Sequence, residues 1–424
     1  MARLVQLSAP NVSSNGAVHF ASLQPHPEKH SQDRLVVEQW DLGERGSWRF
    51  RAVFDGHANG DETVDYVFSS LPSKVKSSLS ALPVSHCTDV ETVSSLLQET
   101  ISAIDDSIKQ GVLELFPSSD YIERLSDDEI RTIVNDHSIS NDTGHMAEVT
   151  VPSPTGPTAL ANKYVGRGWN NIKVTRAMRG TTVLIVLIGP DGGMWTASLG
   201  DCQAVLGQKK NLNWTTTILS ANHNASEPSE VARLKTEHPG EEEDVVVKNR
   251  VLSLIAVTRA IGDHQFKLPG IYTKRVFALT IPGMNRPEYH TQIIVDRNFT
   301  PPYVSGIPEV KYIKLEDDVQ SCLFMCSDGL LDLYGGEDWQ EKHIAIMELC
   351  NNWVDLVGEK LNSGSALLEN LALFLLIRGL WGPPKSFTGK SWTDEDALNR
   401  MSSLLTLEFK DKWMDDTTVL VEVL

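Results

Sequence analysis

The stretch Trp48-Arg-Phe-Arg-Ala-Val-Phe54 runs directly into Asp55-Gly56-His57. Its apolar residues predict a buried strand, and the end of that strand presents a carboxylate, a flexible backbone and an imidazole together. Such a trio can hold a hard metal ion and supply a proton. Taken alone, an acidic turn after a strand is usually only a solvated turn.

The same pattern, an aspartate at the edge of an apolar, β-prone run, recurs along the chain. Its further members are Asp201 after 197–200, Asp328 after 323–327, and Asp415 before 417–424. Carboxylate oxygens select hard cations such as Mg²⁺ and Mn²⁺, whereas zinc sites normally contain His or Cys. These residue types suit metal-assisted hydrolysis of a phosphate ester. Their sequence spacing, however, does not bring the positions together.

Composition is typical of a globular protein. The chain has 424 residues, of which 41% are hydrophobic and 22% charged, so it can bury a large core, and we expect one domain. The formal net charge of −18 argues against nucleic acid or an anionic membrane as a partner, because both would repel such a surface. The longest apolar run, 371–377, is much shorter than the ~20 residues of a membrane span and predicts a core helix.

The five cysteines have neither zinc-site spacing nor the even number of a disulfide framework. This usage predicts a reducing intracellular compartment. Residues 1–24 contain one basic residue, Arg3, and no acidic one, as in a transit peptide, but 17–23 already has the pattern of a first strand. We therefore favour the cytosol, with the mitochondrion as the alternative.

Periodicity and turn residues predict the order of the elements. In chain order these are a hairpin of 34–40 and 48–54, a helix over 90–108, strands over 181–188, 194–199 and 201–206, a helix at 226–234, helices between 328 and 414, and a closing strand at 417–424. Two segments with many turn residues or prolines, 117–178 and 268–308, are interpreted as insertions. The pattern as a whole favours an α+β fold with a layered sheet core.

Six motifs occur in the order found in the metal-dependent protein phosphatases of type 2C, which the chain resembles over nearly its whole length. They are Asp55-Gly-His57, Gly180-Thr-Thr182, Gly200-Asp-Cys-Gln-Ala204, Asn249 to Asp263, Ser327-Asp-Gly-Leu-Leu-Asp332 and Asp415-Asp-Thr-Thr-Val419. A chance match of six ordered motifs is far rarer than a single match. The segments 219–225, 233–239, 300–304 and 308–310 further resemble the pyruvate dehydrogenase phosphatase branch of this family.

The resemblance implies a central pair of antiparallel sheets flanked by helices, a four-layer α-β-β-α sandwich with a two-metal site at one edge. It implies two Mg²⁺ or Mn²⁺ ions, with a weaker third ion in some members. The metal ligands it implies are Asp55 as the bridge between two ions, the Gly56 carbonyl, Asp328 and Asp415, with Asp201 and Asp332 at the third site. For Asp201 and Asp332, a capping role is an equal alternative.

The same resemblance implies a protein serine/threonine phosphatase. A hydroxide bridging the two ions would attack the phosphorus of phosphoserine or phosphothreonine in line, without a covalent phosphoenzyme, and His57 would be the general acid. Asp33, with Gln32 beside it, would orient metal-bound water. The expected partner is a phosphorylated protein, and we expect the chain to be a monomer.

The sequence departs from the family pattern near the expected substrate site. The family has Glu-Asp where this chain has Gln32-Asp33, and its phosphate-gripping arginine falls at Glu28, which leaves Lys29 or Arg34 as the substrate-binding candidates. These departures support an alternative function, a weak or inactive pseudophosphatase that binds or regulates a partner. Hydrolysis of small phosphate metabolites is a third hypothesis.

Several motif residues have a simpler structural interpretation. Gly180, like the other motif glycines, is interpreted as a residue needed for a turn or for close packing. Arg259 and Asp263 are interpreted as supports of a structural turn, without a chemical role. The substitution of the family's arginine by Gln203 predicts a less basic substrate pocket.

Overall fold

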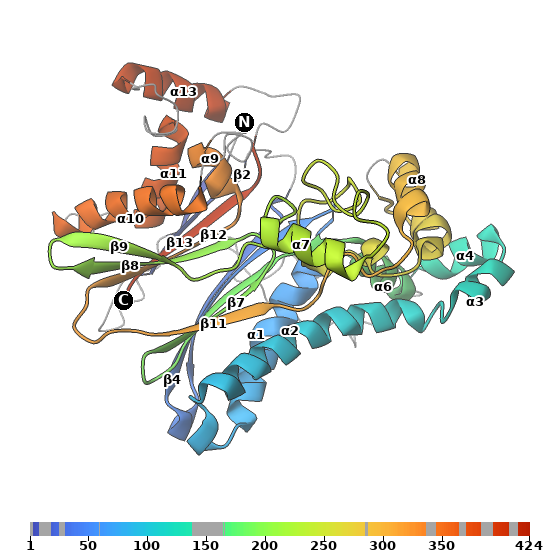
Figure 1. Ribbon diagram of the computed structural model, residues 1–424, viewed down its shortest axis with the longest axis horizontal. Coiled ribbons are helices and arrows are strands. Elements are labelled where there is room, and N and C mark those ends of the chain that lie inside the picture. Colours follow the sequence, from blue (N-terminus) through green and yellow to red (C-terminus); the bar gives the residue numbers. More distant parts are fainter. Residues whose placement is uncertain are drawn as a thin grey trace. The chain divides into compact units, whose positions relative to one another are not determined.

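The computed structural model describes residues 3–7, 18–24, 30–58, 60–137, 164, 166–284, 287–335, 345–363, 370–382, 393–406 and 414–424. They form two compact units, each built from segments that are distant in the sequence (Figure 1). Unit 1 draws on 1–55, 184–221 and 311–424, and unit 2 on 56–183 and 222–310. The strand β4, Ser47–His57, continues from unit 1 into unit 2 after Asp55.

Unit 1 contains a six-stranded antiparallel sheet in the order β1-β2-β13-β12-β8-β9. Its strands are β1 (Arg3–Leu7), β2 (Val18–Gln24), β8 (Gln203–Lys210), β9 (Asn213–Ile218), β12 (Ser321–Cys326) and β13 (Thr417–Val423). The closing strand β13 pairs with both β2 and β12, so segments from both ends of the chain share this sheet. The strand predicted at 17–23 is present as β2. It is the second strand of the chain and not the first, because β1 precedes it and pairs antiparallel with it.

A second sheet in unit 1 is built around the predicted hairpin. Its strands there are β3 (Asp33–Asp41), β4, β6 (Val183–Ile188), β7 (Gly193–Leu199) and β11 (Glu309–Lys314), with the 3-10 turn η1 (Gly43–Arg45) between β3 and β4. β3 and β4 pair antiparallel, with Asp33 opposite Asp55, which confirms the hairpin.

The two sheets of unit 1 enclose one apolar core, and helices cover the outer face of the six-stranded sheet. The sequence of β12 is apolar almost throughout because alternate residues of a strand face opposite sides, and both sides of this strand are buried. Leu323 and Met325 pack between the sheets, whereas Cys322, Phe324 and Cys326 pack in the core on the other face, which the helices cover. The predicted antiparallel β-sandwich flanked by helices is therefore confirmed.

The helices of unit 1 are α9 (Gly329–Gly335), α10 (Ile346–Asn362), α11 (Leu371–Trp381) and α13 (Asp394–Thr406). In Figure 1, α10 runs along β9, and it packs against that strand. The predicted core helix is confirmed as α11, which starts where the Asn370 side chain accepts a hydrogen bond from the Leu373 N–H.

None of the helices in the described ranges combines the length and apolar character needed to cross a bilayer. All five cysteines are buried and none forms a disulfide.

Unit 2 is mainly helical. Its elements are α1 (Glu62–Ala81), η2 (Val84–His86), α2 (Val90–Leu113), α3 (Ser119–Arg124), α4 (Asp127–Val134), α6 (Trp169–Met178), β5 (Gly180–Thr181), α7 (Pro228–Glu237), β10 (Ile261–Gly262), η4 (His264–Phe266), η5 (Tyr272–Val276), η6 (Phe277–Leu279) and α8 (Pro287–Arg297). The helix predicted from Val90 is confirmed, and α1 packs along it (Figure 1). Both segments interpreted as insertions contain helices, and residues 138–163 of the first lie outside the described ranges.

Candidate metal centre

Three carboxylates from separate parts of the chain meet in unit 1. Asp55 lies near the end of β4, Asp201 in the turn between β7 and β8, and Asp328 between β12 and α9. One carboxylate oxygen of each residue lies within 4.8 Å of the others. Asp201 is buried, and the other two are partly exposed. The fold thus brings together positions that their sequence spacing could not connect.

Burial and mutual repulsion oppose the ionisation of this cluster. Burial raises the pKa of Asp55 well above its usual value, and the charges of Asp328 and Asp33 raise it further. Burial also raises the pKa of Asp328 strongly, with the charges of Asp201 and Asp415 acting in the same direction. Several like charges at short range are stable together only when a cation or bound protons compensate them.

Two predicted metal ligands lie outside this group of three. Asp415 comes just before β13, and its charge raises the pKa of both Asp55 and Asp328. Asp332, in α9, raises the pKa of Asp328. Both are therefore electrostatic neighbours of the cluster, and their role as ligands stays a prediction. The same holds for the Gly56 carbonyl, which belongs to β4.

Asp33 is held beside the cluster by a defined set of hydrogen bonds. The Ser327 hydroxyl donates to Asp33 Oδ2 over 2.7 Å and accepts from the Thr418 N–H over 2.9 Å. Burial, followed by the charge of Asp416, raises the pKa of Asp33 to about 7. The neighbouring Gln32 N–H donates to Asp416 Oδ2 over 2.8 Å, so this turn is anchored to the segment that carries Asp415.

The residues present fit a hard divalent cation. All donor atoms of the cluster are carboxylate oxygens, the ligand type that Mg²⁺ and Mn²⁺ prefer. Within the described part of the chain, the buried oxygens Asp33 Oδ1 and Asp328 Oδ1 have no hydrogen-bond partner. Buried acceptors without partners are rare in folded proteins, and a bound ion would satisfy them.

Of the two predicted substrate-binding residues, Arg34 and Lys29, the structure describes Arg34 alone. Arg34 uses Nη1 to donate to the backbone oxygens of Ser31 (2.5 Å) and Asp33 (2.9 Å). Lys29 and Glu28 lie outside the described residues. Gln203 is buried, and its Nε2 donates to the Asp201 backbone oxygen over 3.0 Å. This side chain therefore supports the turn that carries Asp201.

His57 has a partner that the sequence reasoning missed. In unit 2, His57 Nε2 lies 2.5 Å from Asp263 Oδ2, and the Asp263 side chain is completely buried. The interpretation of Asp263 as a purely structural turn residue overlooked this contact. The two residues are 206 positions apart, so their spacing carries no signal. The one available hint was that both lie in motifs of the same family.

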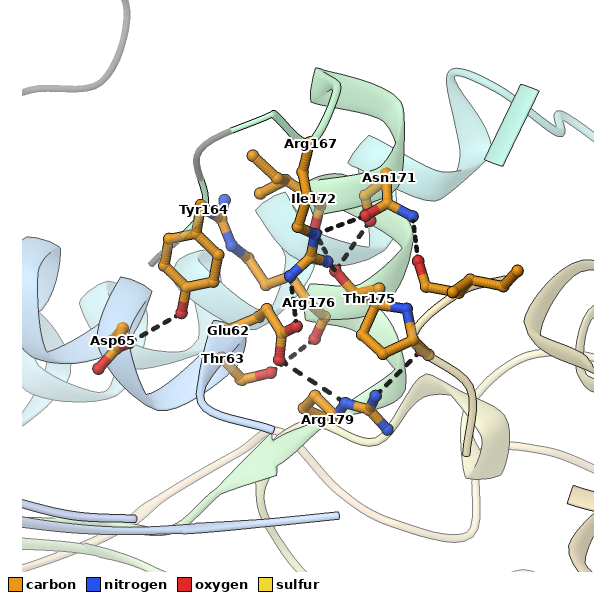
Figure 2. Close-up of polar contacts among 12 residues, drawn as sticks. Glu62, Thr63, Asp65, Tyr164, Arg167, Asn171, Ile172, Thr175, Arg176 and Arg179 are labelled. Carbon is orange, nitrogen blue, oxygen red and sulfur yellow. Dashed lines mark hydrogen bonds and ion pairs between the residues drawn. The ribbon is translucent and has the colours of Figure 1, made fainter. Parts of the chain in front are cut away.

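Arg179 fixes the backbone on both sides of this pair. Its Nη1 donates to the Ala58 oxygen, and its own backbone oxygen accepts from the Asp263 N–H, each over 2.8 Å. Figure 2 shows the supporting contacts, in which Glu62 Oε2 lies 3.7 Å from Arg179 Nε and Glu62 Oε1 lies 2.8 Å from Arg167 Nη1. Arg179 and Glu62 are both buried, so their ion pair and the hydrogen bonds of Arg179 lie in the interior of unit 2.

Comparison with known proteins identifies relatives of this chain. Residues 159–341 match the family model described as Protein phosphatase 2C. The human mitochondrial pyruvate dehydrogenase phosphatase 2 is 30% identical over 272 residues, which cover 59% of this chain and 49% of that protein. The bovine mitochondrial phosphatase 1 is 36% identical over 172 residues, covering 40% and 31%. The matched region thus spans half or less of the length of these two relatives.

Two further comparisons cover nearly the whole chain. A protein phosphatase 2C homolog of Schizosaccharomyces pombe is 26% identical over 423 residues, covering 95% of this chain and 78% of that protein. The crystal structure of a serine-threonine phosphatase 2C from Toxoplasma gondii has a TM-score of 0.51 at 12% identity, covering 100% of this chain and 99% of that one, and it shows a shared fold. Together with the six ordered motifs, these matches show that the chain is similar to the protein phosphatases of type 2C, among them the pyruvate dehydrogenase phosphatases.

Proposed function

We propose that the chain is a metal-dependent protein serine/threonine phosphatase, which hydrolyses phosphoserine and phosphothreonine. One observation carries the proposal. Asp55, Asp201 and Asp328 gather carboxylate oxygens within 4.8 Å of one another, in a chain that matches the Protein phosphatase 2C model over residues 159–341. Such a cluster is a poor substrate site by itself but a good cation site.

The cluster would hold two Mg²⁺ or Mn²⁺ ions. When bound, these ions would lower the pKa of water and neutralise phosphoryl oxygens. Asp55, Asp201 and Asp328 supply the ligands that the geometry supports. Gly56, Asp415 and Asp332 are further proposed ligands, and a third ion is part of the proposal. Asp33, fixed by the Ser327 hydroxyl, would orient the attacking water.

His57 is the proposed general acid. It lies two residues beyond Asp55 in β4, and alternate residues of a strand face the same side. A water oxygen bonds to phosphorus as the ester P–O bond breaks, and the departing serine or threonine oxygen takes a proton from the His57 imidazolium. Water releases its proton to solvent, and solvent reprotonates His57. A cysteine nucleophile is not required, and burial raises the pKa of Cys322, Cys326 and Cys350.

The proposed partner is a phosphorylated protein, and the chain is proposed to act as a monomer. Because the human and bovine relatives are named as mitochondrial pyruvate dehydrogenase phosphatases, a phosphoserine peptide from that dehydrogenase is the first substrate to test. The cytosol is the proposed compartment, and the names of these relatives support the mitochondrion as the alternative. Fractionation of cells that express the tagged chain distinguishes the two.

The deciding experiment is hydrolysis of phosphoserine peptides by the purified full chain, with Mn²⁺ or with EDTA. We expect turnover that depends on Mn²⁺ and falls by ~100-fold or more in Asp328→Asn, because this change removes charge and a ligand oxygen at the cluster. Asp120→Asn, at an exposed position in α3, is the matched control and should retain full turnover. No hydrolysis with Mn²⁺, together with no effect of Asp328→Asn on Mn²⁺ binding, would refute the proposal.

Two outcomes would favour the alternatives instead. A chain that binds Mn²⁺ but hydrolyses nothing would be a pseudophosphatase, and a large gain in turnover on Gln32→Glu would trace the loss to that neutral amide. Faster hydrolysis of small phosphate metabolites than of peptides, measured side by side, would favour a metabolite phosphatase. The described residues offer no observation that favours either of these alternatives over the protein phosphatase.

A further inference from the structure

We propose that Asp263 positions the His57 imidazole. We further propose that Gly180, which has no Cβ, leaves the space in which these two side chains contact each other. The inference rests on the proposed phosphatase function, because it assigns a task within that reaction. The three residues come from three motifs, at positions 57, 180 and 263, and all lie in unit 2. His57 ends β4, Gly180 begins β5, and Asp263 directly follows β10.

The contact has the geometry of a strong, oriented hydrogen bond. Only 2.5 Å separate His57 Nε2 from Asp263 Oδ2, and the carboxylate side chain is 0% exposed whereas that of His57 is 25% exposed. A carboxylate can only accept, so Nε2 carries the hydrogen. The proton that His57 transfers then resides on Nδ1. Asp263 thus selects which nitrogen acts, and its hydrogen bond fixes the orientation of the imidazole ring.

Asp263 is held in an unusual backbone conformation. Its φ of 52° lies in the left-handed region, and its N–H donates to the Arg179 oxygen over 2.8 Å. The preceding Gly262 has φ +84°, and a Cβ there would lie 2.1 Å from that same oxygen. A non-glycine residue persists in this region only when its surroundings determine it. The backbone around Asp263 is therefore shaped to present the carboxylate to His57.

Gly180 leaves the space in which the pair forms. It is paired with His57 between β4 and β5. A Cβ on Gly180 would lie 2.0 Å from Asp263 Oδ2 and 2.1 Å from His57 Nε2. Every other residue type would therefore force the carboxylate and the imidazole apart. Of the two reasons for a glycine here, a turn or close packing, the structure shows close packing.

A purely structural carboxylate in the same unit looks different. Asp105 uses both oxygens, since Oδ1 accepts from the Gly262 N–H and both oxygens accept from Lys267 Nζ, each over 2.8 Å. In contrast, Asp263 Oδ1 has no hydrogen-bond partner among the described residues. The one side-chain hydrogen bond that the structure gives Asp263 therefore goes to the imidazole. This distribution fits a carboxylate that serves His57 better than one that braces a turn.

The test uses two esters that differ in their need for an acid. A phosphoserine peptide releases an alkoxide that must be protonated, whereas p-nitrophenyl phosphate releases a stable phenolate that needs no proton. With Mn²⁺ and the full chain, we expect Asp263→Asn to lower kcat for the peptide by ~100-fold or more and kcat for p-nitrophenyl phosphate by less than about threefold. His57→Gln should show the same selective loss. The double variant should be no slower than His57→Gln, because the two residues act as one unit.

Asp136→Asn is the matched control, since Asp136 accepts from the Asn170 and Asn171 N–H groups in unit 2. It should affect the two esters equally. If Asp263→Asn also slows both esters equally, or slows neither, the positioning role is wrong while the phosphatase function stands. If the wild-type chain hydrolyses neither ester, the phosphatase function itself fails.

A measurement on the wild-type chain covers the case in which Asp263→Asn does not fold. Proton–nitrogen correlation spectra of the imidazole should show a strongly deshielded proton on His57 Nε2, which disappears in His57→Gln. A His57 ring that carries its neutral-state proton on Nδ1, or that lacks the deshielded signal, would overturn the inference. This readout does not depend on activity or on bound metal.

Discussion

The aspartates of the cluster are unusual because the folded chain opposes their charge. Asp33, Asp55 and Asp328 all have raised pKa values, with burial as the largest cause and neighbouring carboxylates as the next. Evolution normally avoids such repulsion unless function requires it, so raised pKa values in a cluster point to a functional site. The cost of this arrangement should be visible in the stability of the metal-free protein.

We expect the metal-free protein to become less stable as pH rises from about 4 to about 7. Folding raises the pKa of Asp33 from its ordinary value of 3.8 to about 7, so in this window the folded state binds more protons than the unfolded state. The stabilisation is fully present below the lower value and is lost as pH passes the upper one. Urea midpoints in EDTA, measured across the window, test this. Asp33→Asn should weaken the trend, and saturating Mn²⁺ should reverse it; a flat profile in EDTA would contradict it.

Single residues also show where the sequence was informative. Aspartates at predicted strand ends, such as Asp201, could be proposed as ligands because strand and turn patterns are local. The pair of His57 and Asp263 could not be found this way, because the contact depends on how distant segments pack. The prediction that Gln203 makes the substrate pocket less basic stays a prediction. The structure adds that its buried side chain donates to the Asp201 backbone oxygen, a contact that the sequence could not indicate.

At the scale of elements, the strands that the sequence did not predict lie at the edges of the two sheets. β1 and β9 are the two ends of the six-stranded sheet, and β11 is an end of the second sheet. An edge strand needs fewer apolar residues, because its faces are only partly covered. β9, for example, alternates between exposed and partly buried residues and contains three threonines. Central strands such as β6 and β12 are buried throughout and were predicted correctly.

The packing of α10 on β9 leads to a prediction about Gly358. Alanine in place of a helical glycine normally stabilises by ~1 kcal/mol. Here a Cβ would lie 2.4 Å from Trp214 Cδ1 and 2.5 Å from its Nε1, so the ring would have to move. We expect Gly358→Ala to destabilise by about 1–3 kcal/mol in urea unfolding. Gly111→Ala in α2 is the control, because its Cβ would approach no atom closer than 3.5 Å and should stabilise by about 0.5 kcal/mol. Equal effects of the two changes would show that the contact with Trp214 is unimportant.

At the scale of the whole molecule, both units are discontinuous in sequence. Unit 1 is assembled from three segments and unit 2 from two. The sandwich could be predicted, because apolar strand patterns and the family resemblance agree. The division into units could not, because interleaved segments leave no linker and no shift in composition at their boundaries. Whether the chain is one domain in the family's sense stays a prediction.

The position of β13 predicts how the molecule responds to truncation. This strand pairs on both sides, with β2 and with β12, so its loss would open the six-stranded sheet in the middle. We expect deletion of 417–424 to abolish cooperative unfolding, measured by circular dichroism during heating. Deletion of 1–7 removes the edge strand β1, which pairs only with β2 in the described structure, and should leave a cooperative transition. A normal transition after the first deletion would mean that β13 is not needed to hold the sheet.

The buried thiols have a practical consequence. All five cysteines are reduced and shielded, four of them in unit 1 and Cys87 in unit 2. An alkylating reagent can modify a thiol only after the surrounding side chains part and the sulfur meets solvent. The rate of alkylation therefore measures how often the structure around each thiol opens. Peptide mapping of the adducts gives this rate separately for Cys87 in unit 2 and for the four cysteines of unit 1.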